Sequence, residues 1–432
     1  MNLEKYQQYS RIARGLEQAD LVLKDARIIN VFTEEIIRGD IAIQDGIIAG
    51  IGSFQGKEER DLGGKYVCPG FIDSHLHLES TLVTPAELVT VASRHGTTTF
   101  IVDPHESANV SGLAGIDYIL EQTEDVKANV YVMMPSCVPA TGIDDNGCTL
   151  TAQDMAPYLN NSRILGLGEV MDSISVVQGD KGMHDKLELF EGRIRDGHAP
   201  FLVEGDLQAY AMAGIATDHE CSFFDYAMRE RRNGLTILIR EGSAARNLEA
   251  LVGGLVQRKM NGEGFCFCTD DKHIEDIQQE GHIDHNVRKA IRLGMNPVSA
   301  IKMATINAAN CYGLKDKGAI APGRQADLLV LSDLVNVEVE DVYYKGQLID
   351  KNENIVIKPC APELKNTVHV AEFSKEAFHL ESKDGTFPVI LCDTFRKNTE
   401  ITATSRKRRR RRKNQRRKSW AWSRPSRARQ RQ

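Results

Sequence analysis

Residues 68–79 read Cys68-Pro-Gly-Phe-Ile-Asp-Ser-His-Leu-His-Leu-Glu79. This apolar run is typical of a buried strand, and it ends in two histidines one residue apart, His75 and His77. Side chains at positions i and i+2 of a strand point the same way, so the two imidazoles can converge on one point. Neutral imidazole is the commonest metal ligand in proteins. Two unrelated polar residues at an exposed strand end are the alternative, but the spacing and the apolar context favour a metal site on a barrel.

The middle of the chain alternates short apolar runs with helical stretches, which is the pattern of a parallel sheet covered by helices. Eight candidate strands can be counted, the number that a (β/α)8 TIM-like barrel requires. The fifth and sixth are weakly apolar, and their assignment depends partly on the histidine that ends each of them. The candidates are Val67–His75, Thr97–Asp103, Asn129–Pro135, Arg163–Val170, Gly192–His198, Gly214–His219, Leu235–Glu241 and Gly264–Asp270.

Alternating apolar and polar residues flank this central part on both sides. Residues 20–62 form short alternating runs separated by Asp-Gly, which is typical of β-hairpins, and the same texture returns in residues 323–349. We therefore predict an α/β fold in which residues 67–318 form the barrel. Residues 1–66 and 319–362 are expected to form one small β-sandwich domain, built from both flanks.

The end of the chain differs in composition from the rest. From Arg406 to Gln432 there are fifteen Lys and Arg residues and no Asp or Glu, so the remainder carries a net charge of −21 against −6 for the whole chain. Long blocks of like charge repel themselves, so residues 398–432 are expected to be a disordered tail. This tail resembles a nuclear-localisation or nucleic-acid-binding arm; the alternative, which the abrupt change favours, is a foreign or frame-shifted end without a selected function.

Bulk features indicate where the protein works. No stretch approaches the roughly 18–20 apolar residues that span a bilayer, and the N-terminus lacks the apolar core of a secretory signal. The nine cysteines include no CxxC pair. A reduced, cytoplasmic protein without a membrane partner is the simplest account.

Catalytic groups in such barrels come from the C-terminal ends of the strands. Four histidines and two carboxylates stand at the predicted ends, which is enough for two divalent ions. Mixed imidazole and carboxylate ligation suits Mn²⁺, Fe²⁺ or Zn²⁺ and argues against a thiolate site. His198 and His219 could individually be loop or capping residues, but their spacing after the histidine pair favours ligands. The six candidate ligands are His75, His77, Glu169, His198, His219 and Asp270.

These residues suggest a hydrolytic mechanism. Glu169 is central enough in the set to bridge two ions, with one carboxylate oxygen on each. Water held by such ions has its pKa lowered toward about 7, which gives a hydroxide nucleophile at neutral pH. Asp270 can take the proton from the water and pass it to the leaving group. The expected outcome is hydrolysis of a C–N bond.

Several motifs resemble a known family. Pro69-Gly-Phe-Ile-Asp-Ser-His-Leu-His, Asp270 and the segment Ala319–Val330 are similar to the amidohydrolase superfamily. Narrower motifs, spread over about residues 18–395, resemble the bacterial adenine deaminases of that superfamily. They are His75-Leu-His-Leu-Glu-Ser-Thr, Asp103-Pro-His-Glu, Pro135-Ser-Cys-Val-Pro-Ala, Gly168-Glu-Val-Met-Asp, Asp196-Gly-His-Ala-Pro, Ile239-Arg-Glu-Gly-Ser-Ala-Ala-Arg-Asn and Cys268-Thr-Asp-Asp-Lys with Glu280-Gly-His-Ile-Asp.

The resemblance implies hydrolysis of adenine at C6 to hypoxanthine and ammonia in purine salvage, by a dinuclear Mn²⁺ or Fe²⁺ site on the six ligands above. Glu169 stands where many relatives in the superfamily carry a carboxylated lysine. The resemblance also implies a homo-oligomer, with residues 363–397 as the start of a truncated C-terminal region. The residues that it places near the purine or around the ligands are Asp103, His105, Glu106, Arg240 and Ser243.

Three other hypotheses remain open at this point. Another hydrolase of the same superfamily, such as a cyclic amidase or an N-acetyl-sugar deacetylase, could carry the same ligands, because fold and metal do not fix the substrate. A shortened and inactive product is the second alternative. The third is a nucleic-acid-binding protein whose basic tail is the functional part; binding through such a tail would be non-specific and would weaken with salt.

Overall fold

The computed structural model describes residues 2–352, 354–379, 386–393 and 396–404. These residues fall into two compact units, Met1–Val370 and Ala371–Gln432, which are considered separately. The predicted tail beyond Thr404 lies outside the described residues. No described helix is both long enough and apolar enough to cross a membrane.

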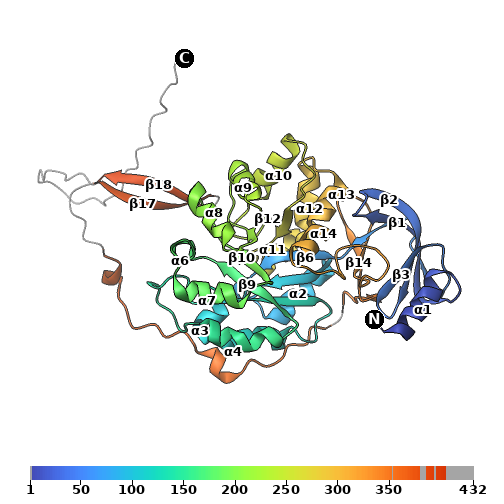
Figure 1. Ribbon diagram of the computed structural model, residues 1–432, viewed down its shortest axis with the longest axis horizontal. Helices are drawn as coiled ribbons and strands as arrows, with labels where there is room; N and C mark the ends of the chain where they lie inside the picture. Colours follow the sequence, from blue (N-terminus) through green and yellow to red (C-terminus); the bar gives the residue numbers. More distant parts are fainter. Residues whose placement is uncertain (1, 353, 380–385, 394–395, 405–432) are drawn as a thin grey trace, which may run out of the picture. The chain divides into compact units, whose positions relative to one another are not determined.

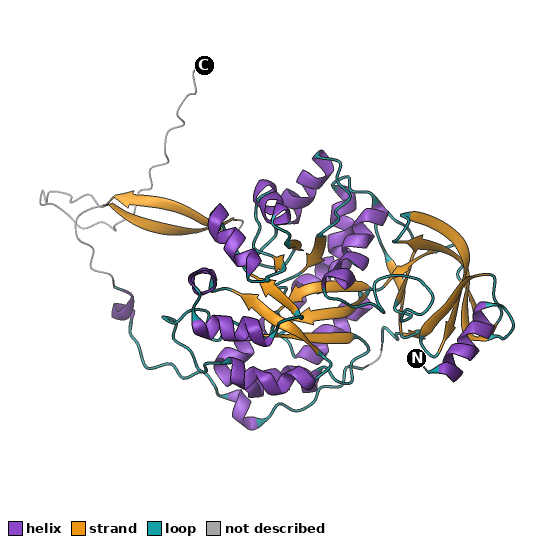
Figure 2. Cartoon of the chain, viewed as in Figure 1, coloured by secondary structure: helices purple, strands orange, loops and turns teal. Residues whose placement is uncertain are grey.

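Eight parallel strands form the centre of the first unit, each near its predicted position (Figures 1 and 2). They are β6 (Phe71–Leu76), β7 (Thr97–Val102), β8 (Asn129–Met134), β9 (Ile164–Val170), β10 (Ile194–Gly197), β11 (Thr217–Asp218), β12 (Thr236–Arg240) and β13 (Phe265–Cys268). Hydrogen bonds join β6 to β10 in one sheet and β11 to β13 in another. The TIM-like barrel expected from the sequence is thereby confirmed.

Backbone hydrogen bonds also cross the two seams between these sheets. At one seam the amide of Asp270 donates to the carbonyl of His75 (2.9 Å), which ties the end of β13 to β6. At the other, the amide of Ala216 donates to the carbonyl of Arg195 (2.9 Å). The residues that end these strands are therefore held at one face of the barrel.

Neighbouring strand residues alternate between the outside and the inside of the barrel. Ile237 and Ile239 in β12 pack with helix residues such as Leu251 and Val287, whereas Leu238 between them belongs to a separate cluster of strand residues that includes Ile72 and Met133. This alternation follows from the two-residue period of a strand. It explains why most positions of these strands are buried.

Helices surround the strands (Figure 2). The helix α2 begins with a capping box, in which the side chains of Thr84 and Glu87 bond each other's backbone amides, and Pro85 occupies its first turn. The helices of this unit after the first strands are α2 (Pro85–Arg94), α3 (His105–Ser111), α4 (Leu113–Gln122), α5 (Ala152–Met155), α6 (Ser173–Gln178), α7 (Lys181–Leu189), α8 (Glu204–Met212), α9 (Phe224–Arg232), α10 (Leu248–Gln257), α11 (Ile274–Glu280), α12 (Ile283–Arg292), α13 (Pro297–Met303) and α14 (Ile306–Cys311), with the 3-10 turns Glu79–Thr81, Ala156–Asn160 and Pro362–Lys365.

A second, mostly antiparallel sheet combines the two ends of this unit, so that β14 lies beside early strands (Figure 1). Its order is β16-β15-β14-β5-β1-β2-β3, with β4 also pairing with β1. The expected sandwich is therefore one hydrogen-bonded sheet, because the long strand β1 pairs with β4 along its first half and with β5 along its second. The elements are α1 (Leu3–Ala13), β1 (Ala19–Asn30), β2 (Glu35–Gln44), β3 (Ile47–Gly52), β4 (Gly56–Asp61), β5 (Tyr66–Pro69), β14 (Leu328–Leu331), β15 (Val339–Tyr344) and β16 (Gln347–Leu348).

The single strand predicted over Val67–His75 is two strands, so that prediction was wrong in this detail. The chain passes from β5 in the end sheet to β6 in the barrel at Gly70. A Cβ atom at this glycine would lie 2.1 Å from Oγ1 of Thr98, so the close approach of the backbone to β7 requires glycine.

The second unit contains a 3-10 turn, Lys375–Phe378, and the antiparallel pair β17 (Thr386–Asp393) and β18 (Arg396–Thr404). Residues 398–404 of the predicted disordered tail therefore lie in a strand, because they extend the ladder with β17.

Candidate metal centre at the barrel mouth

His75 and His77 lie at the C-terminal end of β6, as the first motif predicted, and both side chains are buried. Nδ1 of His77 lies 2.7 Å from the carbonyl oxygen of Asp103, which fixes the ring. Its other nitrogen, Nε2, lies 3.4 Å from Oε1 of Glu169 and 3.2 Å from Oδ1 of Asp270. The free nitrogen of this histidine thus faces both candidate catalytic carboxylates.

Glu169 stands between the histidines of opposite strands. Its Oε2 lies 2.8 Å from Nδ1 of His198 and 3.2 Å from Nε2 of His219. Its Oε1 faces the other side, toward Nε2 of His77 and Nε2 of His75, the latter 4.0 Å away. The carboxylate therefore presents one oxygen to each half of the histidine set.

His198 and His219 follow β10 and β11, the two strands that were weakest in the sequence. The hydroxyl of Tyr210 accepts a hydrogen bond from the amide of His198 (2.9 Å) and donates to the carbonyl of Val170 (2.5 Å), which anchors the short strand β10 to β9. The ring of His219 stacks on that of His75 with centroids 4.1 Å apart. Both histidines therefore lie in the same cluster as the pair on β6.

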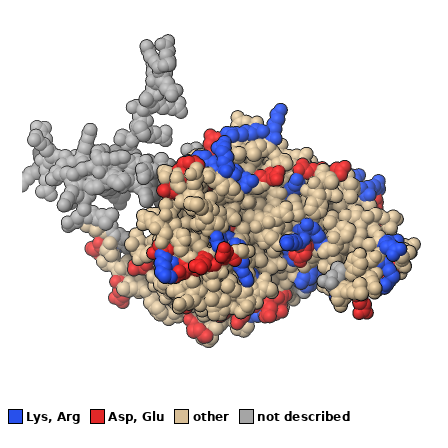
Figure 3. Space-filling model, in the orientation of Figure 1, with Lys and Arg blue, Asp and Glu red and all other residues tan. Residues whose placement is uncertain are grey.

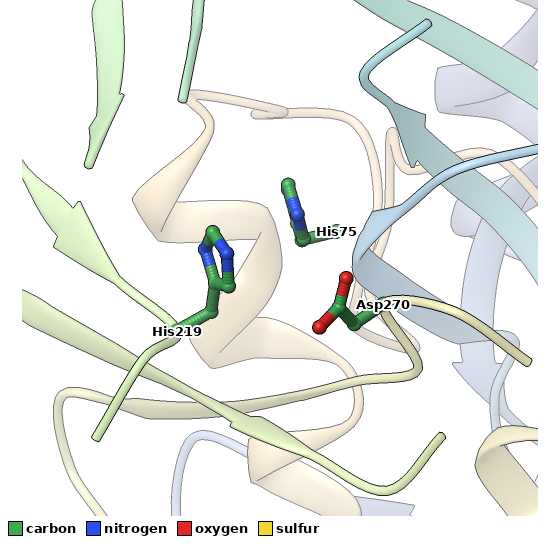
Figure 4. Close-up of side chains that lie close together, drawn as sticks. All are labelled: His75, His219 and Asp270. Carbon is green, nitrogen blue, oxygen red and sulfur yellow. The ribbon is translucent and has the colours of Figure 1, made fainter. Parts of the chain in front are cut away.

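Asp270 completes the set from the end of β13. Its backbone is in the left-handed region, with φ of 59°, which is uncommon for a residue other than glycine and frequent at functional sites. Figure 4 shows His75, His219 and Asp270 facing one another from three separate strands. One ligand atom from each of these residues lies within 4.8 Å of the other two.

The cluster has the electrostatics of a cation site. Burial alone would raise the pKa of Glu169, but the charge of His219 and the nearby imidazoles of His105 and His198 hold it well below its usual range. Burial would lower the pKa of His219, yet the neighbouring Glu169 raises it to about 9. The carboxylates thus stay ionised and draw positive charge into a buried space.

Several buried polar atoms in this cluster have no hydrogen-bond partner. They include both ring nitrogens of His75, Oε1 of Glu169 and Nδ1 of His219. Buried polar atoms are nearly always paired, so a group of unpaired donors and acceptors that converge needs a further partner. A divalent cation fits this imidazole and carboxylate set.

The other predicted residues lie at different distances from this centre. His105 belongs to it, since its Nδ1 lies 3.1 Å from Glu169, and Asp103 supports it by accepting a hydrogen bond from the amide of Glu169 (2.7 Å). Glu106 is half exposed at its edge, 3.8 Å from Nδ1 of His77. Ser243 instead lies in the loop after β12, where its hydroxyl donates to Asp276 and accepts from the amide of His273.

Some residues of the site were missed by the sequence analysis. The side chain of Glu220 binds Arg240, and the carboxylate of Glu79 accepts hydrogen bonds from the amides of Glu106 (3.1 Å) and Ser107 (3.2 Å) at the start of α3. Glu220 follows the candidate ligand His219, and Glu79 lies within the motif His75-Leu-His-Leu-Glu-Ser-Thr. Adjacency to a ligand was therefore the available signal, but their partners are set by the fold.

The loops that carry His198 and His219 are held together by Asp218, whose carboxylate accepts from the amides of Ala199 (2.7 Å) and Cys221 (3.0 Å). Beneath them Glu230 is buried and accepts a hydrogen bond from Sγ of Cys221. Burial, reinforced by the charge of Asp218, raises the pKa of Glu230 to about 10. Its carboxyl group is therefore protonated at neutral pH.

This raised pKa predicts a pH-dependent stability. An unfolded chain releases the Glu230 proton above about pH 4.3, whereas the folded chain keeps it until about pH 10. The stabilisation from this group is therefore lost as pH rises between these two values. Glu230→Gln keeps the shape and the neutral state. We expect the Tm of this variant to fall less than that of the wild type between about pH 6 and about pH 9. Parallel Tm curves for the two proteins would contradict the assignment.

Comparison with known proteins agrees with this fold. The model of the amidohydrolase family matches residues 66–349. An adenine deaminase of Desulfitobacterium hafniense is 55% identical over 384 residues, which is 89% of this chain and 68% of the relative. An adenine deaminase of Clostridium acetobutylicum is 45% identical over 85% of this chain and 65% of its own length. The chain thus spans about two thirds of the length of these relatives.

Solved structures with low sequence identity share the fold. A crystal structure of an adenine deaminase superposes with a TM-score of 0.58 at 18% identity, over 77% of this chain and all of the other. The structure of an enamidase gives 0.56 at 16% identity, over 76% of this chain and 95% of the other.

Proposed function

The chain belongs to the amidohydrolase family, within the group of adenine deaminases, and on this premise we propose that it hydrolyses adenine at C6. Water adds its oxygen to C6, the bond from C6 to the exocyclic nitrogen breaks, and hypoxanthine and ammonia are released. The observation that carries the proposal is the position of Glu169, with one oxygen toward each half of the histidine set and Asp270 beside it.

We propose that this cluster holds two divalent ions, Mn²⁺ in the first place and Fe²⁺ or Zn²⁺ as alternatives. His75, His77 and Glu169 form one group of converging donors, Glu169, His198 and His219 form a second, and Asp270 lies against the first. When bound, such ions supply the Lewis acidity that lowers the pKa of a coordinated water.

The proposed roles of the protein side chains follow from their contacts. Asp270 moves the proton from the attacking water to the leaving nitrogen. Its Oδ2 already accepts from Nη1 of Arg240 (2.9 Å), so Oδ1 is the atom that carries the proton. Glu106, at the open edge, and His105 are the proposed purine contacts. Asp103 and Arg240 orient the groups that react, and Ser243 fixes the loop after β12.

The test is ammonia release by the purified chain loaded with Mn²⁺. We expect ammonia and hypoxanthine from adenine, and neither ring-opened N-carbamoylglycine from hydantoin nor acetate from N-acetylglucosamine 6-phosphate, the substrates of the rival hydrolases. Chelation should abolish the release and Mn²⁺ should restore it. Turnover of a rival substrate in place of adenine would overturn the proposal.

The setting of the reaction is also a proposal. Eight described cysteines are free, which fits a reduced compartment, and we propose that the chain serves purine salvage in the cytoplasm as a homo-oligomer.

For the basic tail we propose only non-specific binding to nucleic acid. Acidic and basic side chains are interspersed on the face of the described residues shown in Figure 3, so the charge block in the sequence is the source of any such binding. Deletion of residues 405–432 is expected to leave kcat/KM for adenine unchanged and to remove binding to a duplex at low salt, because that binding depends on counterion release. Loss of deamination on deletion would contradict this account.

A further inference from the structure

Arg240, at the end of β12, is enclosed by two carboxylates. Its Nη1 donates to Oδ2 of Asp270 (2.9 Å) and also to Oε1 of Glu220, and its Nη2 donates to Oε2 of Glu220 (3.2 Å). The side chain of Arg240 is 2% exposed. Glu220 thus binds the arginine with both oxygens, in the planar geometry that fixes an arginine most firmly.

A buried arginine at this position needs such a partner. Its charge acts on the neighbouring His219 and opposes the rise in the pKa of that imidazole, and it lies beside Asp270, at the edge of the space into which the cluster draws a cation. Asp270 alone would have to balance both the arginine and the cation. A buried charge that loses its partner is costly, so the second carboxylate is what allows Arg240 to remain at the site.

Glu220 is not placed as a metal ligand or as a purine contact. Its Oε1 is 3.9 Å from Nδ1 of His198 and 3.9 Å from Nε2 of His219, whereas Glu169 is 2.8 Å and 3.2 Å from the same atoms. Both of its oxygens are engaged by Arg240.

We propose that Glu220 is a positioning residue: it holds Arg240 in the orientation that keeps Oδ2 of Asp270 occupied and Oδ1 turned toward the reacting groups. This inference rests on the proposed function, because it assigns Glu220 a role in the same reaction. It predicts that Glu220 acts on the catalytic step rather than on purine binding or metal content.

Kinetics of two variants test the role in catalysis. Glu220→Gln is expected to lower kcat for adenine by about 10- to 100-fold, with KM and bound metal within about twofold of the wild type. Glu220→Asp, which keeps the charge, is expected to have a kcat at least about tenfold higher than that of Glu220→Gln. The matched control is Glu17→Gln, which breaks an exposed ion pair with Arg11, near the N-terminus and outside the barrel. This variant should leave kcat unchanged.

Each other result overturns the proposal in a recognisable way. A rise in KM at constant kcat would make Glu220 a purine contact. Loss of bound metal would make it a ligand. A wild-type kcat in Glu220→Gln, or no recovery in Glu220→Asp, would remove it from the positioning of Asp270.

A double-mutant cycle in the metal-free protein tests the pairing of Glu220 with Arg240, the carboxylate clamp, without any activity assay. The unfolding equilibrium constants of Glu220→Gln, Arg240→Met and the double variant are expected to show a coupling of at least about 30-fold. The same cycle on the exposed pair, made with Glu17→Gln and Arg11→Met, should show a coupling of at most about fivefold. Coupling as small as in this control would overturn the clamp. If the wild type releases no ammonia from adenine while the coupling is large, the proposed function fails and the clamp stands.

Discussion

Glu169→Gln is expected to lower kcat for adenine by at least about 10³-fold, since loss of the metal's Lewis acidity removes several kcal/mol of transition-state stabilisation. The substitution conserves shape but replaces one oxygen by an NH₂ group. In the structure both oxygens face histidines, Oε2 at 2.8 Å from His198 and Oε1 at 3.4 Å from His77. An amide can offer an acceptor to one half of the set only, so the bridge between the halves is lost.

Metal analysis and kinetics on the same preparation measure this effect. We expect Glu169→Gln to bind fewer metal ions than the wild type, by at least one ion per chain. The control is Glu249→Gln, at an exposed position in α10, which should behave as the wild type. A variant that keeps its full metal content and more than about a tenth of the wild-type kcat would show that Glu169 is not the bridge.

Asp270→Asn is expected to lower kcat by about 10²- to 10⁴-fold, the range that proton transfer by a positioned side chain contributes. The amide can still accept the hydrogen bond from Arg240, so the loop and its left-handed backbone should persist. What the variant loses is the oxygen that carries the proton. KM for adenine should change little, because Asp270 has no proposed contact with the purine in the ground state.

A thermal melt and the separate values of kcat and KM distinguish this from misfolding. Glu263→Gln is the control, since Glu263 is exposed and shortly precedes the same strand, β13. We expect it to keep a kcat within a few-fold of the wild type. Normal turnover by Asp270→Asn would assign the proton transfer to another group.

The barrel and the grouping of the six candidate ligands at its mouth could be predicted, because both depend on local patterns. Apolar runs marked most of the eight strands, and a histidine or carboxylate at the end of most of them marked the mouth. Where the apolar pattern was weak, the predicted ends of the strand were inaccurate. The strand predicted over Gly214–His219 is only Thr217–Asp218 (β11), and contacts with neighbouring elements stabilise it rather than its own apolar residues. The break at Gly70 also escaped notice, because only the packing against Thr98 reveals it.

The partners of charged side chains could not be predicted. Arg240 was expected near the purine or around the ligands; its two Nη groups donate to Asp270 and Glu220, which follow the strands on either side of β12. Ser243 was grouped with the site, yet it bonds Asp276 in its own loop. Such pairings depend on which strands are adjacent in space, which a single sequence does not state.

The central claim is that His75, His77, Glu169, His198, His219 and Asp270 gather around two divalent ions. The most direct measurement is an anomalous difference map from a crystal of the chain grown with Mn²⁺. The account predicts two peaks per chain, one on each side of the Glu169 carboxylate. A map with no peak among these residues, or with one peak that Glu169 does not touch, would contradict it.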